Sequence, residues 1–197
     1  MKYPDNINDL AQLPIDFMGI IFYEKSPRFA GDDLLETSST KKRVGVFVDA
    51  DISNITTKTE RYKLDFIQLH GNESAELCGI VSKIKPVIKA FSIARKEDFE
   101  KTKDYENICS FFLFDTKTPN YGGSGQKFDW EILNNYTGNT PFLLSGGISA
   151  DDAKAIQAID HPQFRGVDLN SRFETEPGLK DIQLLEKFIK ELRYEQD

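Results

Sequence analysis

Short apolar runs separated by helical patterns constrain the fold of this chain more than any other feature of the sequence. The runs are rich in β-branched and aromatic residues and nearly continuous in apolarity, which is typical of parallel strands covered on both faces. They lie at Phe17–Phe22, Val44–Val48, Phe66–Leu69, Val87–Phe91, Phe111–Phe114, Phe142–Leu144 and Gly166–Leu169. Strands that alternate with helices in this way indicate an α/β fold.

Helical spacing recurs between and around these runs. It predicts helices at Asp5–Leu13, Ser74–Ile84, Ser149–Ile159 and Leu179–Leu192. Ile7, Leu10 and Leu13 form one apolar stripe of the first helix, with Asp5 or Asn6 as its N-cap. The second helix has Leu77, Ile80, Val81 and Ile84 on one face. Asn72 or Glu73 is expected to cap the second helix, and Ser149 the third.

Two α/β architectures fit this alternation, an open doubly wound sheet and a closed barrel. Polar or glycine-rich groups follow many strands rather than those at one switch point, which favours the barrel. These groups are Glu24–Ser26, His70–Gly71, Asp115, Gly146–Gly147 and Asn170–Ser171. Because a helix precedes the first visible strand, we predict a single-domain (β/α)8 TIM barrel over residues 1–197 whose first β-strand is absent from this chain. Seven of its strands are then visible in the sequence.

Composition excludes several functional classes. The chain has 197 residues, 39% of them hydrophobic, and a formal net charge of −7. That length and apolar content predict one globular domain, and the negative charge argues against a nucleic-acid partner. The sequence has neither an apolar run that could span a bilayer nor a signal peptide, so we expect no membrane association. Cys78 and Cys109 lack the spacing of metal ligands and are expected to be free thiols in a reducing cytoplasm.

The segment Phe112–Gly125 carries the strongest candidate for chemistry. An apolar strand ends there in Asp115, and a loop with Gly122 and Gly123 follows. A carboxylate at the carboxyl end of a buried strand suits a proton donor or a ligand anchor. The glycines give the loop the backbone freedom to wrap around a ligand.

Three further groups are weaker candidates. Gly146 and Gly147, followed by a helix and by Asp168, Asn170 and Ser171 after the next strand, predict a phosphate site, although a plain tight turn would use the same glycines. Arg28 can clamp a carboxylate, or can be a solvated surface residue. His70 can contact a ligand or be a satisfied core histidine, and it has no second ligand at a useful spacing for a metal.

These pieces, in this order, resemble the phosphoribosylanthranilate isomerase family of tryptophan biosynthesis. The matching segments are Phe17–Phe29, Val44–Val48, Phe66–Gly71, Val87–Ala90, Phe114–Trp130, Leu143–Ile148 and Asp168–Asp181. The most specific of them reads Asp-Thr-Lys-Thr-Pro-Asn-Tyr-Gly-Gly-Ser-Gly from Asp115, followed by Phe-Asp-Trp.

The resemblance implies an Amadori rearrangement of N-(5-phosphoribosyl)anthranilate without cofactor or metal. Asp115 matches the family's general acid, which protonates the ribose ring oxygen. Arg28 matches the arginine that meets the anthranilate carboxylate, and the phosphate region matches Gly146, Gly147, Asn170 and Ser171. His70, Gly122, Gly123 and Asp168 are the other expected substrate-binding residues. We expect a monomer or a homodimer that binds a small phosphosugar.

The sequence departs from the family pattern at two places. The family's general base is a cysteine in a Cys-Gly-Met sequence before the first helix, and Met1 matches the methionine of that sequence. We therefore expect the chain to start past the base, through a late start codon, a shortened piece or a true loss, and to have little activity. The second departure is Arg172, which stands where many relatives have glycine and adds a positive charge near the expected phosphate.

Two other functions compete with the isomerase. One is a catalytically dead barrel that keeps the phosphate and carboxylate contacts but cannot remove the proton. The other is a different phosphosugar barrel enzyme, such as an epimerase or indole-glycerol-phosphate synthase. That reading lacks support, because neither a metal-ligand cluster nor a paired lysine and glutamate stands at the expected strand ends.

Overall fold

The computed structural model of the protein describes residues 1–31, 40–116 and 130–194. The strands of its main sheet are β1 (Phe17–Ile21), β2 (Lys42–Phe47), β3 (Phe66–Leu69), β4 (Val87–Ile93), β5 (Phe111–Thr116), β6 (Phe142–Ser145) and β7 (Phe164–Val167). The α-helices are α1 (Pro4–Gln12), α2 (Ile52–Tyr62), α3 (Ala75–Val81), α4 (Ala153–Gln157) and α5 (Ile182–Tyr194). Shorter elements are the 3-10 helices η1 (Lys96–Tyr105), η2 (Trp130–Asn135), η3 (Ala150–Asp152) and η4 (Ser171–Phe173), and the strands β8 (Glu174–Glu176) and β9 (Leu179–Lys180).

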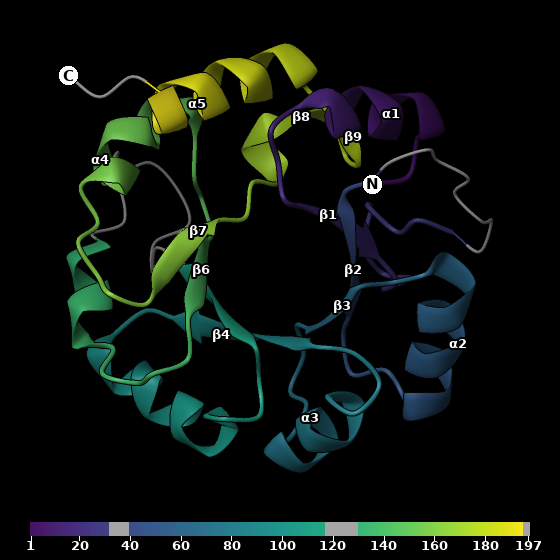
Figure 1. Ribbon diagram of the computed structural model, residues 1–197, viewed down its shortest axis with the longest axis vertical. Coiled ribbons are helices and arrows are strands. Elements are labelled where there is room, and N and C mark those ends of the chain that lie inside the picture. The colour runs from purple at the N-terminus through teal and green to yellow at the C-terminus, as the bar shows by residue number, and fades with distance from the viewer. Residues whose placement is uncertain (32–39, 117–129, 195–197) are drawn as a thin grey trace.

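The main sheet is parallel and runs in chain order from β1 to β7. It curves into a TIM-barrel-like ring with the helices outside it (Figure 1). All seven predicted strands are present. The last lies two residues earlier than predicted: β7 ends at Val167, and beyond it the Asp168 amide still donates to the Leu144 carbonyl oxygen of β6 at 2.8 Å.

The ring is open between β7 and β1. These two strands are the ends of the sheet order among the described residues, so each has an edge without a strand partner. The Met1 amine lies at the β1 edge and donates a hydrogen bond to the Gly19 carbonyl oxygen at 2.9 Å. Helices α1 and α5 lie side by side over this part of the ring, with the β8–β9 hairpin beside them (Figure 1). The sheet is therefore barrel-like but not closed by strand pairing.

The layer between the sheet and its outer helices is dominated by aromatic side chains. Phe112, Phe114 and Phe142 point outward from neighbouring strands and are fully buried. Tyr136 packs against all three, at ring centroid distances of 6.2, 5.1 and 5.6 Å. Burying side chains of this size contributes about 1.5–3 kcal/mol each, so this layer holds β5 and β6 in place.

The inside of the ring is filled at the amino ends of the strands and polar at their carboxyl ends. Phe17, Phe66 and Phe111, the first residues of β1, β3 and β5, contact one another with centroids 5.1–6.3 Å apart. Because side chains alternate along a strand, the residues at even spacing from Phe111 also point inward, ending with Asp115. The apolar plug thus leaves the carboxyl end of the ring for a site.

Several predicted helix details are wrong. Neither Asp5 nor Asn6 caps α1; its N-cap is Tyr3, which makes no side-chain cap, and Pro4 starts the helix. The N-cap of α3 is Ser74, whose hydroxyl accepts from the Leu77 amide, rather than Asn72 or Glu73. Ser149 does cap the third predicted helix, whose first turn is the 3-10 helix η3.

Two more differences concern helix faces and ends. Of the predicted apolar face, Val81 is buried and Leu77 and Ile84 pack against the core, but Ile80 is 41% exposed, and Cys78 is buried although it was not predicted on that face. Helix α5 starts at Ile182 rather than Leu179, because Leu179 and Lys180 pair with β8 in an antiparallel hairpin.

Candidate functional site

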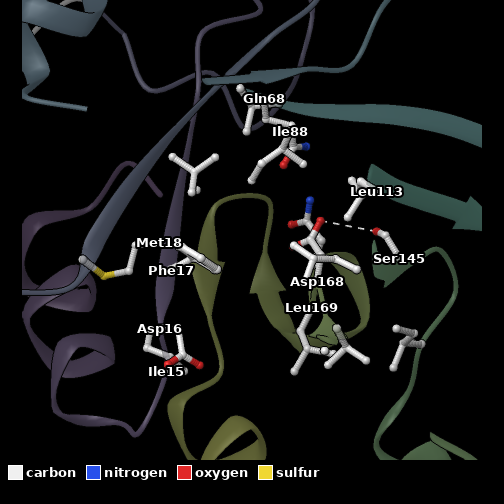
Figure 2. A pocket seen from close by; sticks show the side chains of 18 of the residues that line it. Ile15, Asp16, Phe17, Met18, Gln68, Ile88, Leu113, Ser145, Asp168 and Leu169 are labelled. Atoms are coloured by element: carbon white, nitrogen blue, oxygen red, sulfur yellow. Dashed lines mark hydrogen bonds between the residues drawn. The ribbon is translucent and has the colours of Figure 1, made fainter. Parts of the chain in front are cut away.

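A cavity of about 1630 Å³ extends from the carboxyl ends of the strands, at His70 and Asp115, through the opening between β7 and β1, where Phe17 and Phe164 also line it. Figure 2 labels lining residues from both edges of the opening, Phe17 and Met18 of β1 on one side and Asp168 and Leu169, which follow β7, on the other. Gln68, Ile88 and Leu113 line it from the opposite strands (Figure 2). Arg28, His70, Asp115, Gly146, Gly147, Asp168, Asn170 and Ser171 all line this cavity, so the structure gathers the predicted site residues that it describes.

Asp115 reaches the cavity from the carboxyl end of β5. Its backbone neighbours are Ser92 on β4 and Ser145 on β6. One carboxylate oxygen, Oδ2, lies 3.7 Å from His70 Nε2 at the end of β3. The other ring nitrogen of His70, Nδ1, lies 3.0 Å from the Gln68 amide nitrogen. Since an amide nitrogen only donates, Nδ1 accepts, and a neutral His70 carries its proton on Nε2, facing Asp115.

Gly146 packs directly against Asp115. Its φ of 95° is in the left-handed region, and a Cβ there would lie 2.2 Å from the Thr116 carbonyl oxygen and 2.6 Å from Asp115 Oδ1. The Thr116 hydroxyl donates to the Ser145 carbonyl oxygen at 3.0 Å, which ties the ends of β5 and β6 together. Only glycine therefore fits at position 146, and the β6 turn sets where the carboxylate lies.

Gly147 differs from its neighbour. Its φ is 66°, but nothing lies within 4 Å of where its Cβ would be. The Ser149 amide that follows is already occupied, since it donates to Asp152 Oδ2 at 2.8 Å. Position 147 thus presents backbone to open space beside the cavity.

The residues after β7 form the rim of the cavity next to this turn. Ser145 Oγ donates to Asp168 Oδ2 at 3.3 Å, as the dashed line in Figure 2 marks. Asn170 and Ser171 are exposed, and Ser171 opens the short helix η4. Arg172 is exposed at the same rim. This rim and the Gly146–Gly147 turn together resemble the place where barrel enzymes hold phosphate.

Arg28 is not a solvated surface residue. Its Nε donates to Glu174 Oε2 at 2.7 Å, and its Nη2 lies 2.7 Å from the same oxygen. The side chain of Arg28 is 21% exposed and that of Glu174 only 3%. Glu174 is one site residue that the sequence reasoning did not single out, although it lies within the Asp168–Asp181 segment.

A buried ion pair below His70 was also missed. Lys89 Nζ lies 3.2 Å from Glu73 Oε2, with side chains 3% and 1% exposed, and donates to the Gly71 carbonyl oxygen at 2.9 Å. Glu73 in turn accepts from the Gly71 amide at 2.9 Å and from the Asp49 amide at 2.9 Å. The pair holds the turn that carries His70. A lysine inside the apolar run Val87–Phe91 was the signal that could have pointed to it.

The two cysteines lie away from the cavity. Cys78 on α3 and Cys109 before β5 are free and buried, and neither is among the residues that line the cavity. A side-chain hydrogen bond joins them, and this bond together with burial raises the pKa of the Cys109 thiol. Gly122 and Gly123 lie outside the described residues.

The described part of the chain has no cluster of three or more His, Cys, Asp or Glu side chains that could hold a metal ion. No described helix is long and apolar enough to cross a membrane.

A parallel, helix-covered ring whose polar side chains gather at the carboxyl ends of the strands defines an enzyme of the TIM-barrel-like class. The family model for N-(5'-phosphoribosyl)anthranilate (PRA) isomerase matches residues 2–191. The chain belongs to this family, and its function is PRA isomerisation in tryptophan biosynthesis.

Individual relatives agree with the family match. An N-(5'-phosphoribosyl)anthranilate isomerase of Parabacteroides distasonis is 52% identical over 199 residues, covering 98% of this chain and 90% of the relative. The crystal structure of phosphoribosyl anthranilate isomerase from Thermotoga maritima is 30% identical, with a TM-score of 0.83 over 98% of this chain and 95% of that one. A further isomerase structure, in complex with reduced 1-(o-carboxyphenylamino)-1-deoxyribulose 5-phosphate, has a TM-score of 0.80 at 26% identity, over 98% of this chain and 95% of that one.

These matches extend over nearly the whole chain, and they do not support the interpretation that it is shortened and inactive. Both remain predictions from the sequence. What the structure adds is that the described residues form a seven-stranded ring with one opening.

Proposed function

We propose that this chain carries out the isomerisation as an Amadori rearrangement, with Asp115 as general acid. A proton passes from Asp115 to the ribose ring oxygen, the bond between that oxygen and C1 breaks, and the anilino nitrogen lone pair forms an iminium. A base then removes the proton from C2, which gives an enolamine; this takes up a proton at C1 and releases its C2 hydroxyl proton to give the ketone of 1-(2-carboxyphenylamino)-1-deoxyribulose 5-phosphate. Each step conserves electrons without metal or cofactor.

The inward placement of Asp115 is the observation that carries this proposal. Its carboxylate lines the same cavity as Arg28 and the Gly146–Gly147 turn. His70 Nε2 faces the carboxylate oxygen at 3.7 Å, where an N–H would stabilise the negative charge left once the proton has moved. Proton donor, carboxylate anchor and phosphate turn thus surround one space, as a substrate with an anion at each end requires.

The described residues that line the cavity include no cysteine that could act as the general base. Cys78 and Cys109 are both outside the cavity lining. The opening between β7 and β1 is where an eighth strand of a closed barrel would bring a side chain to the carboxyl end of the ring. We propose that such a strand, carrying the cysteine that the resemblance implies, completes the active enzyme in a cytoplasmic setting.

The position of Cys78 and Cys109 outside the cavity lining also favours a second candidate function, a phosphosugar-binding barrel without catalysis. It keeps Arg28 and the phosphate turn, while neither Cys78 nor Cys109 is among the described residues that line the cavity. The two candidates differ in turnover and not in ligand affinity, so binding alone does not separate them.

The experiment that tests the proposal compares two proteins, this chain and the same chain preceded by a strand ending in Cys-Gly. Turnover of N-(5-phosphoribosyl)anthranilate is measured by chromatography of substrate and product. We expect low activity from the first and a rise of at least about 100-fold in the second, lost again when the added cysteine is replaced by serine. Full activity of the chain alone would show that it supplies its own base. A chain that binds both anions but stays inactive with the strand added would favour the binding barrel.

Arg28→Ala should act mainly on substrate binding. Losing the clamp on the anthranilate carboxylate should raise KM about tenfold or more, which corresponds to about 1.4 kcal/mol, with kcat little changed. Steady-state kinetics measure both constants, and a melting curve checks the fold, because the change also leaves Glu174 without its Arg28 partner. An unchanged KM would mean that Arg28 has a purely structural role.

Inorganic phosphate should stabilise the protein by binding beside Gly147 and Ser171. A ligand that binds only the folded state stabilises it by about 2.7 kcal/mol at 100 times its dissociation constant, so the melting temperature should rise with phosphate concentration. Chloride at equal ionic strength is the control. A crystal grown in phosphate that holds the anion elsewhere, with this turn empty, would refute the assignment.

A further inference from the structure

Three charged side chains form a connected group on the wall of the cavity, and we call them the Glu174 cluster. Glu174 is at the centre, with Arg28 on one oxygen and Lys180 on the other. Arg28 Nε and Nη2 both lie 2.7 Å from Oε2, and Lys180 Nζ lies 3.2 Å from Oε1. Their side chains are 3%, 21% and 10% exposed for Glu174, Arg28 and Lys180. All three line the cavity, so the cluster is part of the site and not of the outer surface.

The N–H donors of the Lys180 ammonium group are taken up by acceptors within the protein. An ammonium group has three of them. Besides Glu174, Lys180 Nζ contacts the Leu169 carbonyl oxygen at 3.1 Å and the Asn170 side-chain oxygen Oδ1 at 3.0 Å. Three acceptors match three hydrogens. Lys180 therefore fastens the segment after β7 to Glu174, and it has no donor left for a ligand.

Arg28, unlike Lys180, keeps N–H donors for a ligand. A guanidinium has five N–H donors, and Glu174 receives one from Nε and one from Nη2. The remaining donors belong to the other edges of the same plane. Because the fork is planar and rigid, holding two donors on Glu174 fixes the direction in which the others point. Glu174 thus fixes the orientation of the Arg28 guanidinium and leaves its other N–H donors for a ligand.

The carboxylate is itself held firmly. Its Oε1 accepts from the Gly178 amide at 3.3 Å, across the turn of the β8–β9 hairpin. The hairpin is fastened to α1, where Asn6 Nδ2 donates to the Lys180 carbonyl oxygen at 2.9 Å and Asn6 Oδ1 accepts from the Lys180 amide at 2.8 Å. Phe173, next to Glu174, is fully buried against Phe188.

The charges of the cluster depend on one another. Burial raises the pKa of Glu174, but hydrogen bonds from Arg28 and the charge of Lys180 outweigh it, so the pKa lies below its ordinary value. Burial lowers the pKa of Lys180, and the neighbouring Glu174 opposes that change. Without the carboxylate, two poorly solvated cations would face each other on this wall.

We propose that Glu174 is a positioning residue that couples the two anion-binding ends of the site. Through Oε2 it aims Arg28 at the substrate carboxylate, and through Oε1 and Lys180 it holds Leu169 and Asn170, beside Ser171, for the substrate phosphate. The inference rests on the proposed function and extends it. Glu174 sets the separation of the two anion sites and so selects ligands that carry a carboxylate and a phosphate at that spacing.

The test is binding of each anion alone, by titration calorimetry with inorganic phosphate and with anthranilate. Glu174→Gln keeps the shape but removes the charge, and we expect both affinities to fall at least about fivefold. Lys180→Met should weaken phosphate binding and leave anthranilate binding within about twofold, because the contact between Arg28 and Glu174 survives. Glu176→Gln is the matched control. This exposed glutamate is on the same strand and accepts a hydrogen bond from the Tyr3 hydroxyl, and its replacement should change neither affinity.

Each result decides the matter. If Glu174→Gln lowers only the melting temperature, or weakens only one of the two anions, Glu174 does not couple the sites and the inference is wrong. If that variant does not fold, Glu174→Asp keeps the charge but shortens the side chain by one methylene, and it should show the same double loss. Wild-type protein that binds neither anion would overturn the proposed site as well. Wild-type binding of both, unchanged in Glu174→Asp, would overturn this inference alone.

Discussion

Asp115→Asn should lower kcat by about 100-fold or more, as expected for a lost general acid. The amide is nearly the same size as the carboxylate, so its contacts with Gly146 and the β5–β6 turn can persist while the acidic proton is gone. KM should change little, because the substrate's two anions are held elsewhere. Steady-state kinetics, on whichever form of the enzyme turns over, measure the loss.

Two results would contradict this role of Asp115. Activity within a few-fold of wild type would exclude general acid catalysis by this residue. A loss that Asp151→Asn reproduces, at an exposed position outside the cavity lining, would mean that the loss is not specific to the site. Melting curves of all three proteins separate lost chemistry from lost fold.

Gly146→Ala should be nearly as damaging, although it adds only one methyl group. At 2.2 Å from the Thr116 carbonyl oxygen and 2.6 Å from Asp115 Oδ1, the new Cβ must push the end of β5 and the carboxylate aside. A displacement of about 1 Å at a reacting group can cost about 100-fold in rate. We expect a fall of that order in kcat together with a lower melting temperature, since φ at this position is 95°.

Gly147→Ala is the matched comparison. Its φ of 66° imposes strain on any side chain, but nothing lies within 4 Å of the added Cβ. It should cost about 1–2 kcal/mol of stability and raise KM, because the Cβ enters the space proposed for the phosphate, while kcat stays nearly unchanged. Equal kcat values for the two alanine variants would mean that Gly146 does not set the position of Asp115.

The central strands β3 to β6 could be predicted because their side chains are largely buried on both faces. Apolar runs such as Phe66–Leu69 and Phe142–Leu144 therefore coincide with β3 and β6 to within one residue. The run Gly166–Leu169 was misplaced, since β7 ends at Val167 and Asp168 and Leu169 line the cavity. Apolarity alone does not distinguish a strand residue from a residue at the rim of a site.

The β8–β9 hairpin could not be predicted from periodicity. Its strands have three and two residues, which is too short for an alternation of apolar and polar residues to be recognised, and β8 is polar. Pro177–Gly178 is a turn signal that could have located it, and the apolar residues from Leu179 onward were instead assigned to a helix. Glu174 and Lys180 went unnoticed for the same reason.

For the site, the sequence identified Asp115 from its place after an apolar strand, and the structure brings its carboxylate to the cavity as that pattern predicts. The two readings of Arg28 were open, because a lone arginine in a loop has no local partner. Its partner, Glu174, is 146 residues away in sequence, and only the fold brings the two together. The tight fit of Gly146 against Asp115 is likewise a tertiary contact that a glycine pair does not disclose.

The most direct test of the account is a crystal structure of this protein with reduced 1-(o-carboxyphenylamino)-1-deoxyribulose 5-phosphate, the ligand of a solved relative. We predict its carboxylate within hydrogen-bond distance of Arg28, its phosphate beside Gly147 and Ser171, and its sugar chain against Asp115. A ligand bound in reverse, with the phosphate on Arg28, or one seated outside the ring, would contradict the account.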